Sequence, residues 1–289
     1  MVGDIRQLTS ARIRRAIRAQ QLVLHCQPMV DCRDGTLCGA EALIRWRRRD
    51  GSIVPTREWV PAAENASVRT RFNLHVLELA AEHQRAWTAR GVSIPVSVNV
   101  TPACLADDAF VASVERMFGG SWPENIRLEI TERTTAINSH ALKSNVERLR
   151  SLGFRFLLDD FGAGYSSLER LSLLPVSTLK IDRSLVSDIT LRSPRHAIVE
   201  SVIHLAHALG LDVVCEGVED AKTWAALQAL GCDHVQGYHV ARPMPAERFP
   251  FFVQHYRATP PQNLPHSTLD FERRTSSTAD RRVGVDRRH

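Results

Sequence analysis

IRLEIT at residues 126–131 and FRFLLD at residues 154–159 are short apolar runs, and the helical pattern of residues 138–151 separates them. Six further runs of the same kind occur along the chain, and longer helical patterns fit most of the gaps between them. A repeat of strand, helix and strand predicts a parallel sheet, and eight strands in roughly 250 residues predict a closed barrel. The other predicted strands are residues 22–27 (LVLHCQ), 38–46 (CGAEALIRW), 94–100 (IPVSVNV), 177–181 (STLKI), 211–216 (LDVVCE) and 234–238 (HVQGY), and the other helical patterns are residues 70–90, 105–118, 195–209 and 220–230, with shorter pieces near 166–172 and 246–255.

The connection between the first two predicted strands breaks this repeat. It is short and contains Asp34-Gly35. A parallel crossover needs about a dozen residues or more, whereas Asp-Gly is typical of a hairpin turn. We therefore expect the first strand to run antiparallel to the second. The predicted fold is α/β, a distorted (β/α)8 TIM-type barrel, and a doubly wound open sheet is the alternative.

Two terminal segments flank the predicted barrel, which spans residues 22–257. Residues 1–21 are rich in Arg, and their apolar residues recur at roughly helical spacing, which predicts a basic amphipathic helix leading into the barrel. Residues 258–289 are rich in Pro, Ser, Thr and Arg without periodicity, which predicts a disordered Arg-rich tail. The apolar positions of the first segment are Ile5, Leu8, Ile13 and Ile17.

Composition restricts the class of protein. With 44% hydrophobic and 24% charged residues, the chain of 289 residues has the make-up of a globular protein, which excludes a disordered or fibrous one. No apolar run approaches the ~18 residues of a membrane span, and no signal-peptide pattern opens the chain, so we expect a cytoplasmic protein without a membrane partner. The net charge of +5 arises at the two ends of the chain, and the barrel has no basic stripe interleaved with aromatic residues. We therefore expect no broad nucleic-acid binding.

Polar residues recur where the predicted strands end. In a barrel of this type, the chemistry gathers at the carboxyl ends of the strands and in the loops that follow. A single Glu in a strand usually faces solvent, but a polar residue at the same end of successive strands predicts a functional site. These residues are Glu41, Asn99, Glu129, Asp159, Asp160, Lys180, Glu216 and Gln236.

The charges of this set predict divalent metal ions. Five carboxylates at one barrel mouth repel one another, so cations must offset them, and Lys180 supplies only one positive charge. Carboxylate oxygens together with the Asn99 amide favour Mg²⁺ or Mn²⁺ over zinc. A pair of ions bridged by one carboxylate satisfies the ligand count best. Two such ions suit hydrolysis of a phosphodiester.

Residues near these strand ends have expected supporting roles. Glu132 lies three positions beyond Glu129, so in a strand it faces the opposite side and is better placed to hold the loop FGAGYSS at residues 161–167. The two glycines of this loop permit unusual backbone angles, although a plain strand-to-helix turn is the alternative. Arg45 is a candidate clamp for a phosphate or a base edge. Its alternative is a solvated surface arginine beside Arg47.

The chain resembles the EAL domain phosphodiesterases, which hydrolyse cyclic di-GMP. The resemblance covers roughly residues 12–252 and rests on several motifs in a fixed order and spacing. They are Gln27-Pro28, Glu41-Ala42-Leu43 with Arg45-Trp46, Pro61 and Glu64, Ser97-Val98-Asn99, Glu129-Ile130-Thr131-Glu132, DDFGAGYSSL at residues 159–168, Leu179-Lys180-Ile181-Asp182, Glu216-Gly217-Val218-Glu219, and Gln236-Gly237-Tyr238.

The resemblance implies cleavage of one phosphodiester bond of cyclic di-GMP to linear 5′-pGpG with two Mg²⁺ or Mn²⁺ ions. It implies that Lys180 assists the attacking water and that Glu219 and Gln236 support the water shell. It also implies a homodimer that pairs near the loop of residues 161–167. By the same resemblance, Glu41, Asn99, Glu129 and Asp159 hold one ion, Asp159, Asp160 and Glu216 hold the other, Glu132 anchors the loop, and Gln27, Leu43 and Arg45 contact substrate.

Two other function classes remain open. One is a catalytically silent receptor for cyclic di-GMP or a protein-interaction module. The other is a metal-dependent barrel enzyme that acts on a different small substrate. Departures from the family pattern avoid the expected metal ligands: His25-Cys26 stands where aromatic residues are frequent, and Ala163 stands where Thr is frequent.

Overall fold

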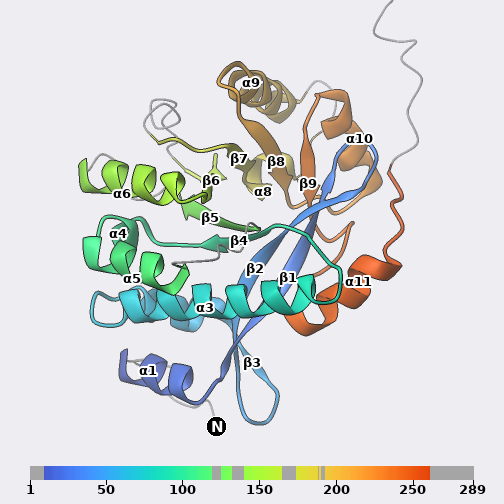
Figure 1. Ribbon diagram of the computed structural model, residues 1–289. Coiled ribbons are helices and arrows are strands. Elements are labelled where there is room, and N and C mark those ends of the chain that lie inside the picture. The colour runs from blue at the N-terminus through green and yellow to red at the C-terminus, as the bar shows by residue number, and fades with distance from the viewer. Residues whose placement is uncertain are drawn as a thin grey trace, which may run out of the picture.

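Strands close into an eight-membered ring in the computed structural model, which describes residues 10–118, 125–131, 140–164, 174–187, 189 and 193–260. Neighbours around the ring are hydrogen-bonded in the order β1-β2-β4-β5-β6-β7-β8-β9, and β9 pairs with β1 again (Figure 1). The eight predicted strands are therefore confirmed, with shifted ends. The ring consists of β1 (Leu22–Asp31), β2 (Leu37–Arg47), β4 (Val96–Asn99), β5 (Ile126–Thr131), β6 (Arg155–Phe161), β7 (Thr178–Ile181), β8 (Asp212–Glu216) and β9 (His234–Gln236).

β1 is antiparallel to both of its neighbours in the ring, and all other ring pairs are parallel. The turn before β2 has the geometry that Asp-Gly favours: Gly35 has φ +73°, and Asp34 Oδ1 accepts a hydrogen bond from the backbone N–H of Thr36 at 2.8 Å. The distorted barrel is thereby confirmed, and the open-sheet alternative is excluded. The two-residue strands β3 (Ile53–Val54) and β10 (Met244–Pro245) pair antiparallel with β2 and β1, respectively.

Helices cover the outside of the ring (Figure 1). Most lie where the periodicity predicts them, but α2, α4 and α8 are additional, and the predicted helical piece at residues 166–172 lies outside the described residues. The helices are α1 (Ser10–Arg18), α2 (Thr56–Ala63), α3 (Arg69–Thr88), α4 (Pro102–Leu105), α5 (Asp108–Phe118), α6 (His140–Ser151), α8 (Arg183–Val186), α9 (Pro194–Ala208), α10 (Ala221–Ala229), the 3-10 helix η2 (Ala246–Arg248) and α11 (Phe249–His255).

Two apolar clusters hold these helices to the strands. One is built around Trp59, Trp87 and Phe110 under α2, α3 and α5, and the other around Trp224 and Val213 under α9 and α10. α1 joins the first cluster because its apolar stripe, which includes Ile13, is buried. The predicted amphipathic entry helix is thus present over residues 10–18, while most of the predicted tail lies outside the described residues.

All six cysteines are free thiols, and five of them are buried. In the part of the chain that the structure covers, no helix combines the length and the apolar character that a bilayer crossing needs.

Candidate functional site

Four carboxylates from four strands surround the ammonium of Lys180 on β7. Lys180 Nζ lies 2.6 Å from Glu216 Oε1 on β8 and 2.9 Å from Glu129 Oε2 on β5. It lies 3.2 Å from Asp159 Oδ1 on β6 and 3.5 Å from Glu41 Oε2 on β2. Lys180 and Glu129 are fully buried. Residues that lie more than a hundred positions apart in the chain therefore meet in one charged cluster, because the strands that carry them are parallel neighbours in the ring.

The cluster holds more negative than positive charge in a buried place, and the pKa values reflect this. Burial alone would lower the pKa of Lys180, but the surrounding carboxylates outweigh it and raise the pKa well above its usual range. Burial raises the pKa of Glu129 well above its usual range, and Lys180 offsets this only in part. Burial likewise raises the pKa of Glu216 to about 8. One ammonium therefore does not satisfy all of these carboxylates.

Glu41 differs from these two acids because it receives additional hydrogen bonds. Gln236 Nε2 donates to Glu41 Oε2 at 2.6 Å, and Asn99 Nδ2 donates to Glu41 Oε1 at 3.1 Å. Burial would raise the pKa of Glu41, but Lys180 and these two amides together hold it below its ordinary value. Glu41 is therefore kept ionised and fixed in orientation by neighbours on both sides.

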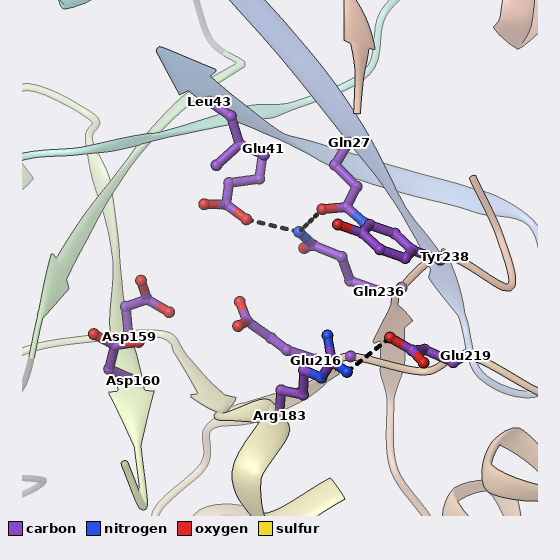
Figure 2. A pocket seen from close by; sticks show the side chains of 12 residues that line it. Gln27, Glu41, Leu43, Asp159, Asp160, Arg183, Glu216, Glu219, Gln236 and Tyr238 are labelled. Atoms are coloured by element: carbon purple, nitrogen blue, oxygen red, sulfur yellow. Dashed lines mark hydrogen bonds and ion pairs between the residues drawn. The ribbon is translucent and has the colours of Figure 1, made fainter. Parts of the chain in front are cut away.

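Glu41, Asp159 and Glu216 of the cluster line a pocket of about 290 Å³ (Figure 2). On one wall, Gln236 Nε2 also donates to Gln27 Oε1 at 3.3 Å, so Gln27, Gln236 and Glu41 form one hydrogen-bonded row. The residues that line the pocket are Gln27, Glu41, Leu43, Asp159, Asp160, Arg183, Glu216, Gly217, Glu219, Gln236, Gly237 and Tyr238. Most of the residues nominated from the sequence are thus at this pocket or directly beneath it.

Arg45 and Asn99 line a neighbouring cavity of about 280 Å³. Arg45 Nη1 donates to the backbone carbonyl of Ile44 at 2.9 Å, and Glu64 lines the same cavity. Leu43 contributes to both cavities and separates them. The structure therefore places Arg45 beside the main pocket rather than inside it.

The end of β6 and the turn after it have an unusual backbone. Asp160 has φ +60°, and Gly162 has φ +94°. A Cβ atom on Gly162 would lie 2.2 Å from Leu185 Cδ1 of α8, so only glycine allows the turn to pack this closely. Glu132 and residues 165–167 lie outside the described residues, so the expected contact between Glu132 and this loop remains a prediction.

The donor atoms around Lys180 fit a hard divalent cation. They are carboxylate and amide oxygens, and four of them are buried without a hydrogen-bond partner. Asp159 Oδ1 and Glu216 Oε1 form ion pairs with Lys180, whereas Glu129 Oε1 and Gln236 Oε1 do not. Across the described ranges, no three acidic, histidine or cysteine side chains are already arranged around a common metal position. The ammonium of Lys180 lies between the carboxylates instead, and it supplies the positive charge there.

Arg183 and Tyr238 line the pocket but were not among the nominated site residues. Tyr238 is the last residue of the Gln236-Gly237-Tyr238 motif, and Arg183 follows directly after Leu179-Lys180-Ile181-Asp182. These positions within and next to motifs were the sequence signal that could have identified both residues. Arg242 Cζ lies 4.2 Å from the centre of the Tyr238 ring, which holds that ring at the rim.

Comparison with known proteins places this fold and site in a family. The EAL domain family matches residues 10–243, which is most of the chain. The chain belongs to the EAL domain family. The resemblance read from the motifs is therefore confirmed.

Relatives of this EAL domain include characterised signalling proteins. The bifunctional diguanylate cyclase/cyclic di-GMP phosphodiesterase MucR of Pseudomonas aeruginosa is 35% identical over 239 residues, which is 82% of this chain and 35% of that protein. The structure of the PaMucR phosphodiesterase in complex with c-di-GMP has a TM-score of 0.75 and 35% identity, and the match covers 83% of this chain and 98% of that one. The chain spans about a third of the length of the curated relatives it matches.

A further similar structure contains both a metal and the dinucleotide. The calcium and cyclic di-GMP complex of BlrP1 from Klebsiella pneumoniae has a TM-score of 0.67 and 29% identity. The match covers 79% of this chain and 57% of that chain.

Proposed function

We propose that this EAL domain hydrolyses one phosphodiester bond of cyclic di-GMP and releases linear 5′-pGpG. The observation that carries the proposal is the cluster of four carboxylates around Lys180, directly beneath an open pocket. Oxygen donors from four strands in one place are what a phosphodiesterase of this type requires. The similarity to the cyclic di-GMP phosphodiesterase MucR and to the PaMucR complex with c-di-GMP supports cyclic di-GMP as the substrate.

The proposal includes two Mg²⁺ or Mn²⁺ ions at the cluster. When bound, such ions lower the pKa of a bound water and stabilise the attacking and leaving oxygens. The buried and unpartnered oxygen of Glu129 and the calcium in the BlrP1 complex support this assignment. The residues assigned to hold the ions are Glu41, Asn99, Glu129, Asp159, Asp160 and Glu216.

The remaining residues of the site position water and substrate in this proposal. Lys180 donates from the floor of the pocket, where it orients the attacking water and offsets negative charge. Gln236 fixes Glu41 and, with the more exposed Glu219, supports the water shell. Glu132 remains the proposed anchor of the loop of residues 161–167.

Substrate binding is assigned to the walls of the two cavities. Gln27 lines the main pocket beside Gln236, and Arg45 lines the neighbouring cavity. Leu43 lies between them, so a ligand with two bases can place one on each side of this side chain. Gln27, Leu43, Arg45 and Gln236 are therefore the proposed substrate contacts.

The deciding experiment is nucleotide chromatography after incubation with cyclic di-GMP and Mg²⁺ or Mn²⁺. We expect wild-type protein to form pGpG and Glu41→Ala to lose activity by about 100-fold or more, with an unchanged circular dichroism spectrum. Glu147→Ala on the exposed face of α6 is the matched control and should keep the wild-type rate. Tight binding without product would support the receptor alternative, and turnover of a different phosphodiester alone would support another metal-dependent enzyme.

A homodimer that pairs near the loop of residues 161–167 is part of the same proposal and rests on the family resemblance. Light scattering should give twice the mass of one chain. A monomer with full activity would contradict it.

A further inference from the structure

We propose that Arg183 binds a phosphate group of the dinucleotide at the rim of the pocket and exchanges Glu219 for that phosphate when the ligand enters. The inference rests on the proposed function and extends it to a residue that was not among the nominated site residues. The contacts of its side chain, the backbone beneath it and the charge of the pocket each support it.

Arg183 is held at the rim by its position in the chain. It is the first residue of α8 and follows the helix N-cap Asp182, whose side chain accepts a hydrogen bond from the backbone N–H of Ser184 at 2.9 Å. Its guanidinium Nη2 lies 3.0 Å from Glu219 Oε1. Figure 2 shows the guanidinium rising between Glu216 and Glu219 on the wall of the pocket.

The backbone of Gly217 makes room for the Arg183 side chain. A Cβ atom on Gly217 would lie 2.3 Å from Arg183 Cγ and 2.6 Å from Arg183 Cβ, so the stem of Arg183 lies directly on the peptide after Glu216. Gly217 also has φ +72°, which disfavours other residues. This close packing directs the guanidinium to one side of the metal-ligand candidate Glu216.

The charge of the pocket gives this guanidinium a role. Among the described residues that line the pocket, Arg183 is the one basic side chain, against five carboxylates. Two other cations lie nearby: Lys180 is buried below and already within 3.5 Å of four carboxylates, and Arg242 lies against the ring of Tyr238. A dinucleotide brings negative phosphates into this acidic pocket, so a basic group at its rim is needed beyond the ions at its floor. The five acids are Glu41, Asp159, Asp160, Glu216 and Glu219.

The present partner of Arg183 can be replaced at little cost. The side chains of Arg183 and Glu219 are 58% and 47% exposed, and ion pairs as exposed as this contribute little to stability. A guanidinium matches two phosphate oxygens with a pair of parallel hydrogen bonds. Glu219 therefore holds Arg183 in position while no phosphate is present, and a phosphate then takes its place.

Calorimetric binding of pGpG and of GpG, which lacks the 5′-phosphate, tests this directly. The terminal phosphate of pGpG carries about −1.5 to −2 charges at neutral pH and is the strongest anion of the pair. We expect wild-type protein with Mg²⁺ to bind pGpG about tenfold more tightly than GpG, and Arg183→Gln to lose most of that preference. Arg183→Lys should keep part of the preference for pGpG. The control is Arg33→Gln, because Arg33 pairs with Asp31 away from the pocket, and this variant should keep the whole preference.

Steady-state kinetics separate this inference from the proposed function. We expect Arg183→Gln to raise KM for cyclic di-GMP by about tenfold while kcat changes less, because a binding contact is lost. Wild-type hydrolysis together with an equal pGpG preference in wild type and Arg183→Gln would overturn the inference and leave the proposed function intact. Absence of hydrolysis together with a pGpG preference that depends on Arg183 would overturn the proposed function and leave this inference intact.

Discussion

At the scale of single residues, the charge cluster depends on one buried ammonium. Lys180 is the shared partner of four carboxylates, and two of these already have pKa values raised by burial. Removing one partner from a buried ionic group leaves uncompensated charge, which costs far more than an exposed ion pair. The same residue therefore serves both the stability and the proposed chemistry of the site.

Lys180→Met should lower the free energy of unfolding of the metal-free protein by about 3–5 kcal/mol. Mg²⁺ should restore part of this loss, because a bound cation replaces the missing charge and stabilises the folded state. Urea denaturation with EDTA and with Mg²⁺ measures both effects, with Lys222→Met on the exposed surface of α10 as the control. A loss that Mg²⁺ does not change would contradict the assignment of a cation site here.

Asp31 provides a pH-dependent prediction away from the site. The hydrogen bond from Arg33 lowers the pKa of Asp31 to about 2, with Arg33 Nη2 2.6 Å from Asp31 Oδ2. A carboxylate with a lowered folded-state pKa contributes stability above its unfolded pKa, and this contribution is lost as the pH falls towards 2. Because Arg33 is 81% exposed, Asp31→Asn should cost less than about 1 kcal/mol at pH 7. The difference from wild type should vanish by about pH 2 in urea denaturation, and a difference constant from pH 7 to pH 2 would contradict it.

At the scale of the elements, the ends of β8 and β9 touch through their backbones. A Cβ atom on Gly237 would lie 2.0 Å from the carbonyl oxygen of Val218 and 2.4 Å from its nitrogen. The backbone N–H of His239 donates to that carbonyl at 3.0 Å, and the backbone N–H of Val218 donates to the backbone carbonyl of Gln236 at 3.1 Å. This contact sets the distance between the pocket walls that carry Glu216 and Gln236.

Gly237→Ala should therefore separate the two walls. Forcing extra atoms into a packed place typically costs about 1–3 kcal/mol, so we expect a lower thermal midpoint and a higher KM for cyclic di-GMP. Gly210→Ala is the control, because a Cβ there would meet no atom within 4 Å even though its φ of +73° causes some strain. Equal effects of the two substitutions on KM would show that the backbone contact does not set the pocket.

At the scale of the whole molecule, the last helices, η2 and α11, pack against α3 in the first half of the chain. Phe249 of α11 stacks on Trp87 of α3 with ring centres 4.8 Å apart, and Trp87 Nε1 donates to the carbonyl of Ala246 at 3.0 Å. β10 adds to the same connection by pairing with β1. The C-terminal segment thus stabilises the side of the barrel where the chain enters.

Phe249→Ala should lower the free energy of unfolding by about 3–5 kcal/mol, since the side chain is fully buried and leaves a cavity. Phe251 lies two positions away in the same helix and is 67% exposed. Phe251→Ala should therefore change stability by only about 0.5 kcal/mol. Guanidinium denaturation of both variants checks the contrast, and similar losses in the two would argue against the stacking on Trp87.

The sequence alone determined the type of fold and the set of candidate ligands. Each ring strand is a short apolar run that its own residues make recognisable, and the Asp34-Gly35 turn determines the direction of β1 locally. Glu41, Glu129 and Asp159 were recognisable because polar residues recur at the same end of successive predicted strands. Short helices such as α8, with four residues, have too little periodicity to be recognised this way.

Only the tertiary structure decided which side chains meet. It placed Lys180 among four carboxylates, Arg45 in the adjoining cavity and Arg183 beside Glu219. These contacts join residues from different strands and loops, so they depend on how the ring closes and how neighbouring strands are aligned. The pattern of apolar residues along the chain predicts which face of a strand is covered, but it contains no information about which distant side chain covers it.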